Sequence, residues 1–152
     1  MVASPDIDVV VVTVKVPHHL KIIKAAIAAG KHVFSEWPLG NGLAEAGELA
    51  ALAAKSNVRG FVGTQARVAP EILYLRQLIA DGYVGKVLST TLTAWGGNCG
   101  GALGSVETYG YLLDQSNGAT MLTIPMGHTL TALRDVLGDI VSLASVSHHK
   151  AG

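Results

Sequence analysis

The 152-residue sequence has one cysteine, Cys99, and few charged or aromatic side chains. A single cysteine excludes a disulfide framework and is typical of a protein of the reducing cytoplasm. Charged residues make up 14% of the chain, and 11 Lys+Arg balance 11 Asp+Glu. No net charge therefore attracts this chain to nucleic acid or to an anionic membrane. Glycines surround Cys99 without a neighbouring histidine or lysine, so we interpret it as a bystander.

The sequence also lacks a long hydrophobic run and an N-terminal signal. Its most apolar stretch, residues 9–14, is far shorter than the ~18–20 residues that a membrane helix needs. Residues 1–5 carry no basic region before an apolar one, so they do not form a secretory signal. Hydrophobic residues still make up 49% of the chain, with a mean hydropathy of +0.41. This balance excludes disorder. It also indicates an apolar surface that must be buried by more chain or by a partner.

The first 85 residues alternate between β-branched apolar runs and helical patterns. A strand that is apolar on both faces is typical of a parallel sheet with helices on both sides. Apolar residues at helical spacing, Gly30 after one helix and Pro70 at the start of another mark the helices. We expect strands at 7–14, 32–35 and 59–63, and helices at 18–29, 42–56 and 71–80. This order predicts a doubly wound parallel α/β sheet.

The pattern changes after residue 85. Residues 86–95 alternate Ser or Thr with apolar residues, which predicts a long strand of an antiparallel sheet with one exposed face. A closing strand is expected at 139–147, a short helix near 109–113, and a helix over 121–137 with Pro125 in its first turn. We therefore expect two partial domains, 1–85 and 86–152, the second too short to form a stable core alone.

A phosphate-binding glycine loop is missing from the expected sheet. No G-x-G-x-x-G follows a strand, and Gly40-Asn41-Gly42 has neither the third glycine nor the preceding strand end. Two explanations remain open at this point. Either the chain does not bind a nucleotide, or its first strand–helix–strand unit lies upstream.

Several motifs resemble the Gfo/Idh/MocA family of NAD(P)-dependent oxidoreductases. The motifs are Ala29-Gly30-Lys31-His32-Val33 running into Glu36-Trp37-Pro38-Leu39, then Val62-Gly63 through Arg67 to Pro70, then residues 79–87, and Gly127-His128. The resemblance covers essentially the whole chain. It implies a partial Rossmann domain at 1–85 that binds NAD or NADP, and the start of an α/β domain with an open antiparallel sheet at 86–152. It also implies a sequence truncated at both ends, and weak or absent dinucleotide binding by these residues alone.

Glu36-Trp37, Gln65-x-Arg67 and Gly127-His128-Thr129 look like the branch of this family that contains the fungal galactose-regulon repressor. Three departures from the catalytic pattern of the family accompany this likeness. Trp37 replaces the lysine of E-K-P, Ile124 replaces the aspartate four residues before His128, and Val14-Lys15-Val16 replaces T-P-N. Neither indole nor an alkyl side chain transfers protons, so His128 remains as the catalytic candidate.

The resemblance implies cofactor-binding roles for residues that follow the expected strands. These residues are Val14, Lys15, Val16, His19, Glu36, Trp37, Gln65 and Arg67. Several candidates also have a structural interpretation: His128 as a buried hydrogen-bonded histidine, Glu36 as a solvated turn residue, Trp37 as packing, Lys15 as a surface charge and His19 as a helix cap or solvent contact. A metal site is disfavoured because the histidines form adjacent pairs that do not share a helix face.

Three functions remain open. The protein could oxidise a hydroxyl of a sugar or cyclitol with NAD(P), or it could be a non-catalytic dinucleotide-binding regulator, or an inactive fragment. The resemblance implies a sugar-like small-molecule ligand and pairing of two copies through the C-terminal sheet. It does not select a substrate, nor NAD over NADP.

Overall fold

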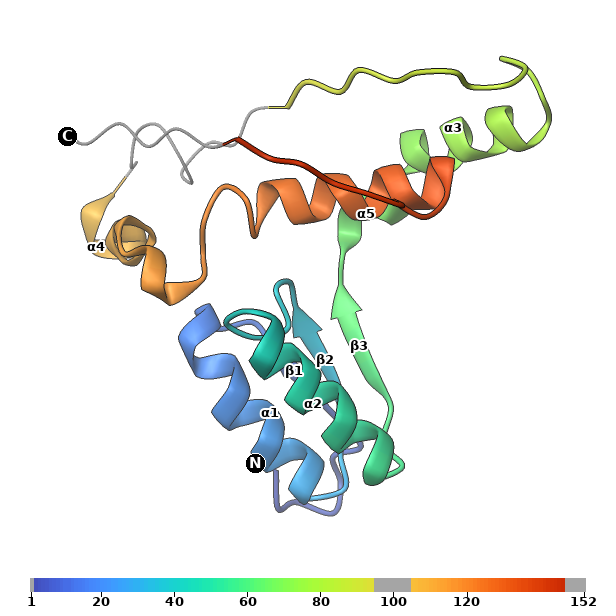
Figure 1. Ribbon diagram of the computed structural model, residues 1–152. Helices are drawn as coiled ribbons and strands as arrows, with labels where there is room; N and C mark the ends of the chain where they lie inside the picture. Colours follow the sequence, from blue (N-terminus) through green and yellow to red (C-terminus); the bar gives the residue numbers. More distant parts are fainter. Residues whose placement is uncertain (1, 95–104, 147–152) are drawn as a thin grey trace.

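The computed structural model describes residues 2–94 and 105–146. Within them, three parallel strands lie side by side: β1 (Val9–Val12), β2 (His32–Glu36) and β3 (Gly60–Gly63). α1 (His19–Ala28) joins β1 to β2, and α2 (Leu43–Lys55) joins β2 to β3; Figure 1 shows both on one face of the sheet. The expected strand–helix alternation and the parallel sheet are confirmed. β1 is shorter than expected because it ends where its pairing with β2 ends, at Val12↔Ser35.

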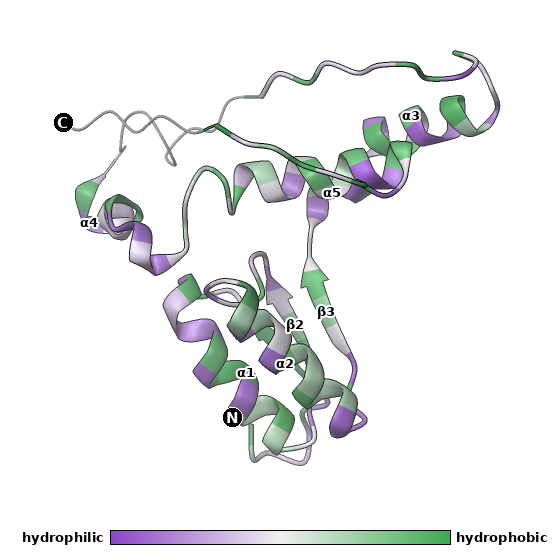
Figure 2. Cartoon of the chain, in the orientation of Figure 1, coloured by the Kyte–Doolittle hydropathy of each residue, from purple (hydrophilic) through white to green (hydrophobic). Residues whose placement is uncertain are grey.

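The core lies between this sheet and its two helices. Val10, Val12 and Val33 point to the helices and are buried, together with Ile23, Ala26, Ile27 and Leu49. The alternate side chains of the strands lie on the opposite face. There Val9, Val11 and Phe61 are 47%, 58% and 51% exposed. Figure 2 shows β3 as hydrophobic along most of its length. The described helices therefore cover one face of the sheet, although its strands carry apolar side chains on both faces.

The chain after β3 forms short helical elements and one long helix. They are η2 (Gln65–Val68), α3 (Pro70–Ala80), α4 (Val106–Tyr109), η3 (Gly110–Leu113), η4 (Gln115–Asn117) and α5 (Pro125–Leu137), while η1 (Val16–His18) precedes α1. Proline begins both α3 and α5, at the position where its missing N–H costs nothing. Figure 1 shows α5 lying across the carboxyl ends of the strands, where it packs against α3 and η2.

The two strands expected in the second half do not form among the described residues. Residues 86–94 and 139–146 run without strand pairing, and no antiparallel sheet is present among the described residues. A strand needs a neighbour for its N–H and C=O groups, and neither segment pairs with one here. Two apolar side chains of these segments, Leu88 and Val141, are 86% and 100% exposed. Residues 95 and 147, and the glycine-rich stretch 96–104 with Cys99, lie outside the described residues. The domain boundary at 85 stays a prediction.

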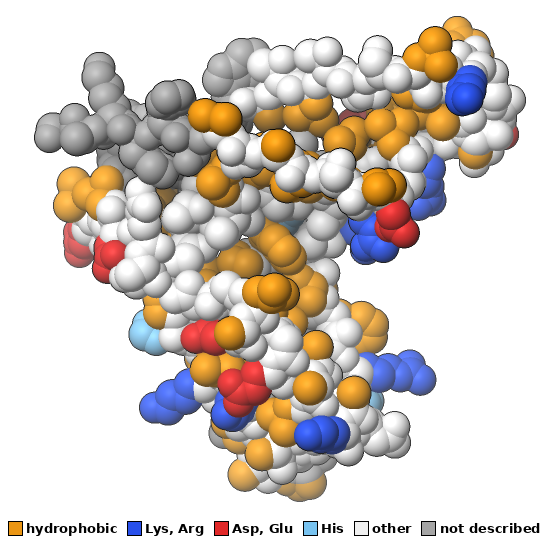
Figure 3. Space-filling model, viewed as in Figure 1, with side chains coloured by type: hydrophobic (Ala, Val, Ile, Leu, Met, Phe, Trp, Pro, Cys, Tyr) orange, Lys and Arg blue, Asp and Glu red, His pale blue; other side chains and the backbone are white. Residues whose placement is uncertain are grey.

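The described part of the chain contains no helix with the length and apolar character of a membrane span. It also contains no group of three or more His, Cys, Asp or Glu side chains placed to hold a metal ion. On the face shown in Figure 3, Lys and Arg side chains are spread around the sheet unit and do not gather in one patch.

Candidate functional site

The candidate site lies at the edge of the sheet where all three strands end. Parallel pairing puts the carboxyl ends of β1, β2 and β3 together, and ligands of doubly wound sheets bind outside this edge. The predicted cofactor-binding residues follow these strand ends along the chain. α5, which carries His128, lies across the same edge (Figure 1). The fold thus gathers the candidates that the sequence placed far apart.

The loop after β1 contacts the second half of the chain through Lys15. Its Nζ lies 4.6 Å from the centroid of the Tyr111 ring in η3, in a cation–π contact. Val16 is buried and begins η1, whereas Val14 is 44% exposed. Val16 therefore anchors the loop, while the Lys15 ammonium group is held over an aromatic ring.

His19, at the start of α1, is almost completely buried, at 1% exposed. Its Nδ1 lies 2.9 Å from the backbone oxygen of Pro38, and its Nε2 lies 2.9 Å from the backbone oxygen of Val14. The Ser35 hydroxyl is 3.5 Å from Nδ1 and donates to the backbone oxygen of Glu36. The imidazole is thus engaged by two loops of the site.

Glu36 and Gly63 are opposite each other at the ends of β2 and β3. A Cβ at Gly63 would lie 3.3 Å from Glu36 Oε1 and 3.1 Å from Phe34 Cζ, so glycine gives the carboxylate and the ring their space. Glu36 is half-buried, and its carboxylate has no hydrogen bond or ion pair with the described residues. It can therefore accept hydrogen bonds from hydroxyl groups of a ligand.

Trp37 reaches from the loop after β2 to the start of α5. Its indole Nε1 donates a hydrogen bond to the backbone oxygen of Thr123. The ring also lies against Gly127: a Cβ there would be 2.6 Å from Cε2 and 2.7 Å from Cζ2. Trp37 therefore holds α5 against the sheet edge, and its N–H group is already used.

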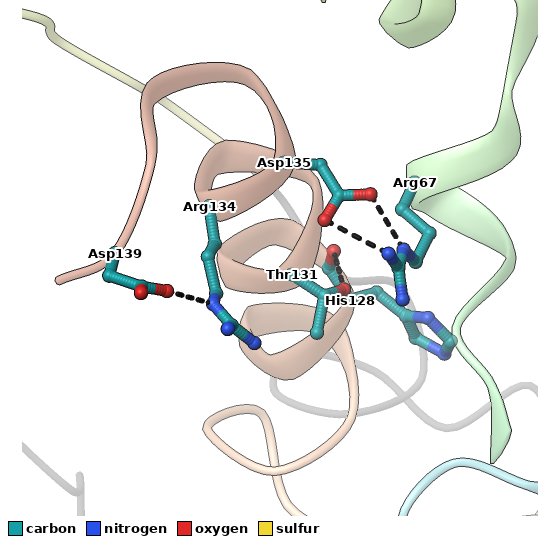
Figure 4. A network of polar contacts seen from close by, with 6 residues as sticks. All are labelled: Arg67, His128, Thr131, Arg134, Asp135 and Asp139. Carbon is teal, nitrogen blue, oxygen red and sulfur yellow. Dashed lines mark hydrogen bonds and ion pairs between the residues drawn. The ribbon is translucent and has the colours of Figure 1, made fainter.

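Arg67 of η2 forms a two-pronged ion pair with Asp135 of α5. Its Nε lies 2.7 Å from Oδ2, and Nη2 lies 3.0 Å from Oδ1 (Figure 4). Asp135 is 17% exposed and Arg67 is 47% exposed, so the pair is partly shielded from water. Gln65 is exposed, and its side chain makes no hydrogen bond with the described residues. Arg67 thus links the end of β3 to the helix that carries His128.

His128 lies in the first turns of α5, where its backbone oxygen accepts a hydrogen bond from the Thr131 hydroxyl (Figure 4). Its Nδ1 is buried and has no hydrogen-bond partner among the described residues. Ile124 stands just before α5 and offers no polar atom in its side chain to orient the imidazole. A buried ring nitrogen without a partner is costly, and such a group marks a place for a ligand atom or a water.

Sequence reasoning missed three residues that shape this edge. Asn41 Nδ2 donates to the backbone oxygen of Ser116 at 2.7 Å, Thr123 accepts from Trp37, and Asp135 holds Arg67. Asp135 follows His128 by seven residues, two helical turns, so helical spacing could have placed the two on one side of α5. No comparable signal pointed to Asn41 or Thr123.

The same pattern therefore recurs after every strand. Each loop at the carboxyl edge is tied to the second half of the chain, by Lys15, by Trp37 and Asn41, or by Arg67. We call these contacts the edge ties. Among the polar candidates, Glu36, Gln65 and His128 have side chains without a hydrogen bond or ion pair to the described residues, and of their atoms the His128 Nδ1 is the buried one. The assigned roles of all nine candidates stay predictions.

A parallel sheet with ligand-binding candidates at its carboxyl edge defines a Rossmann-type α/β protein. Residues 1–64 match the Gfo/Idh/MocA model, described as an oxidoreductase family with an NAD-binding Rossmann fold. Residues 70–150 match the model of the C-terminal domain of Gal80p. The chain belongs to the Gfo/Idh/MocA oxidoreductase family, with a second half of the Gal80p type.

Named relatives include both an enzyme and regulators. The dehydrogenase aclE of Aspergillus oryzae is 37% identical over 140 residues, which are 92% of this chain and 37% of that protein. The regulatory protein GAL80 of Kluyveromyces lactis is 28% identical over 140 residues, 88% of this chain and 30% of that protein. The crystal structure of Gal80p from the same yeast matches with a TM-score of 0.82 over 90% of this chain and 35% of its own. The chain thus spans about a third of the length of these relatives.

Proposed function

We propose that this chain forms part of an NAD(P)-dependent oxidoreductase that acts on a hydroxyl group of a sugar or cyclitol. The observation that carries the proposal is the buried Nδ1 of His128 at the carboxyl edge of the sheet, which has no hydrogen-bond partner among residues 2–94 and 105–146. The family fold supports a dinucleotide there. The residues fit the nicotinamide half of such a cofactor, because the Glu36 carboxylate and the His128 Nδ1, which no described residue binds, lie where the strands end. The phosphate-binding glycine loop is not among them.

In this mechanism a bound nicotinamide supplies the hydride acceptor for the carbinol carbon. His128 receives the hydroxyl proton at Nδ1, so the alcohol loses a hydride and a proton and becomes a carbonyl. Glu36 accepts hydrogen bonds from neighbouring hydroxyl groups and orients the ligand. α5 covers the edge and excludes water from the imidazole. Acid–base assistance of this kind contributes ~10²–10⁴-fold to the rate.

A specific observation favours a second candidate, a non-catalytic dinucleotide-binding regulator. Trp37 stands where the family pattern has lysine, and its indole N–H already binds the backbone oxygen of Thr123. Ile124 stands where the pattern has aspartate. Two groups that would assist proton transfer are thus replaced, while the edge that would bind the cofactor is kept. The likeness to Gal80p supports this alternative.

One experiment separates the two candidates. This chain replaces the corresponding third of the A. oryzae dehydrogenase, whose remaining sequence completes the fold. The graft is tested for NAD(H) and NADP(H) binding by fluorescence, and for cofactor reduction with a panel of sugars and cyclitols. Turnover that disappears in a His128→Ala graft supports the oxidoreductase. Tight cofactor binding without turnover across the panel supports the regulator and contradicts the enzyme.

We also propose that residues 86–94 and 139–146 take part in a larger antiparallel sheet and that two copies pair through it. Their exposed apolar residues, among them Leu88, Val141 and Leu143, support this because extended apolar segments need strand partners. Sedimentation of the chain at increasing concentration tests the idea. A monomer at every concentration would contradict self-association by these segments.

A further inference from the structure

His19 is a buried titratable side chain that the proposed mechanism does not use. It begins α1, it is 1% exposed, and each of its ring nitrogens lies 2.9 Å from a backbone oxygen. The two oxygens belong to different loops: Val14 follows β1, and Pro38 follows β2. One rigid ring at the start of a helix therefore bridges the two loops that form the site.

The residues next to the bridged carbonyls are those that reach the second half of the chain. Val14 precedes Lys15, whose Nζ lies over the Tyr111 ring. Pro38 follows Trp37, whose indole binds Thr123 and packs against Gly127. Gly127 in turn precedes His128. A shift of either loop at its carbonyl would thus be passed to an edge tie, and through Trp37 to the turn of α5 that carries the catalytic candidate.

We propose that His19 is a positioning residue of the site, in an inference that rests on the proposed function. Its ring fixes the separation of the loops after β1 and β2, and thereby the place of the Trp37 indole and of the His128 ring. Both contacts reach carbonyl oxygens, so each is a hydrogen bond only while the ring nitrogen that faces it carries a proton. The two arms of the bridge can be removed separately. The amide nitrogen of asparagine can replace Nδ1, and that of glutamine can replace Nε2.

The test is a pair of matched substitutions in the full 152-residue chain, read by NMR. His19→Gln keeps the arm to Val14 and loses the arm to Pro38. It is expected to shift the Trp37 indole N–H signal and the ring signals of His128. His19→Asn keeps the arm to Pro38, so those signals stay near their original positions, and the Lys15 amide and Tyr111 ring signals shift. The variant Trp95→Phe removes the indole signal of the second tryptophan and thereby assigns the signal of Trp37.

A merely structural role predicts a different result. Both variants would then lower the melting temperature without an arm-specific pattern of shifts, and that outcome overturns the proposal. The unsubstituted chain provides a measurement that survives a failure of the variants to fold. A ring N–H of His19 should be protected from solvent exchange and show a scalar coupling to the carbonyl carbon of Val14 or Pro38; its absence also overturns the proposal.

The graft adds a functional readout. There His19→Gln is expected to lower kcat more than it raises KM, by up to about 10²-fold, because small misplacements of catalytic groups act on the chemical step. An inactive unsubstituted graft would contradict the proposed enzyme and leave the NMR shifts of the 152-residue chain unchanged. Equal kcat in the graft and its His19→Gln variant would contradict the positioning role alone.

Discussion

The indole ring of Trp37 occupies the space that a side chain at position 127 would need. A Cβ on Gly127 would lie 2.6 Å from Cε2 and 2.7 Å from Cζ2 of the ring, closer than real carbon atoms approach. The glycine before His128 therefore lets the loop after β2 and α5 come into direct contact. It is a packing requirement of the site, and it depends on the tryptophan that replaces the lysine of the family pattern.

Gly127→Ala is the direct test of this contact. The added methyl group must displace the indole, and overpacking of this kind costs about 1–3 kcal/mol. Chemical denaturation should show this loss, and the fluorescence of Trp37 should shift as its ring moves. Gly47→Ala is the matched control, because Gly47 lies inside α2 and a methyl group added there would meet nothing within 4 Å. That change should stabilise by about 0.5–1 kcal/mol; equal effects of both would contradict the contact.

The ion pair between Arg67 and Asp135 should contribute more than a surface pair. Its two hydrogen bonds and partial burial predict a loss of about 1–2 kcal/mol on Arg67→Gln. The exchange Arg67→Asp with Asp135→Arg should recover part of the loss in a double-mutant cycle.

The pair between Arg134 and Asp139 is the control for that experiment, since Arg134 lies on the same helix, α5, as Asp135. Its side chains are 64% and 79% exposed, although the hydrogen bond and charge of Asp139 raise the pKa of the Arg134 guanidinium. Arg134→Gln should leave the free energy of unfolding nearly unchanged because solvent screens exposed pairs. A larger loss from Arg134→Gln than from Arg67→Gln would contradict the role of the edge tie.

His128 should be dispensable for stability and required for turnover. Its buried Nδ1 has no partner among the described residues, so His128→Phe removes an unsatisfied polar atom while keeping an aromatic ring. The free energy of unfolding should stay level or rise, since the desolvation penalty of about 1–3 kcal/mol is relieved. Turnover of the graft should fall ~10²–10⁴-fold. A large loss of stability would indicate a structural histidine.

The double change Trp37→Lys with Ile124→Asp restores the family pattern. It removes the indole hydrogen bond to Thr123 and leaves a gap beside Gly127, so stability should fall by about 2–4 kcal/mol. If the substrate pocket is that of an oxidoreductase, turnover of the graft should rise. Unchanged turnover in a folded variant would indicate that the pocket itself has diverged.

The turn at Asp114 should respond to acid. The hydroxyl and the backbone N–H of Ser116 donate to its carboxylate and lower its pKa from its ordinary value. A carboxyl whose pKa is depressed in the folded state stabilises that state above its unfolded pKa and loses this effect as pH falls through the folded value. The Ser116 amide signal should therefore change only at pH values below the ordinary pKa of an aspartate. Asp114→Asn should remove this change and loosen the Asn41 tie to Ser116.

The sequence alone predicted the three strands of the sheet, but not the contacts that the sheet edge makes with the rest of the chain. β-branched runs with helices between them predicted β1 to β3, because that pattern reflects local burial on one sheet. Residues 86–94 have an equally good strand pattern, yet pairing depends on a neighbour that no local pattern supplies. At the site, counting four residues back from His128 identified Ile124 in the position of the family's aspartate. The contact of Trp37 with Thr123 could not be predicted, since it depends on how α5 crosses the sheet edge.

The edge ties also set an order of assembly. Three of them join residues 68 to 86 positions apart, whereas each strand of the sheet pairs with the next one along the chain. Closing a long loop costs more conformational entropy than joining neighbouring strands and helices, so contacts across long loops form more slowly. The ribosome also releases β1 to β3 before α5 is made. The three-stranded sheet should therefore form first, and its carboxyl edge should stay uncovered until α5 packs across it.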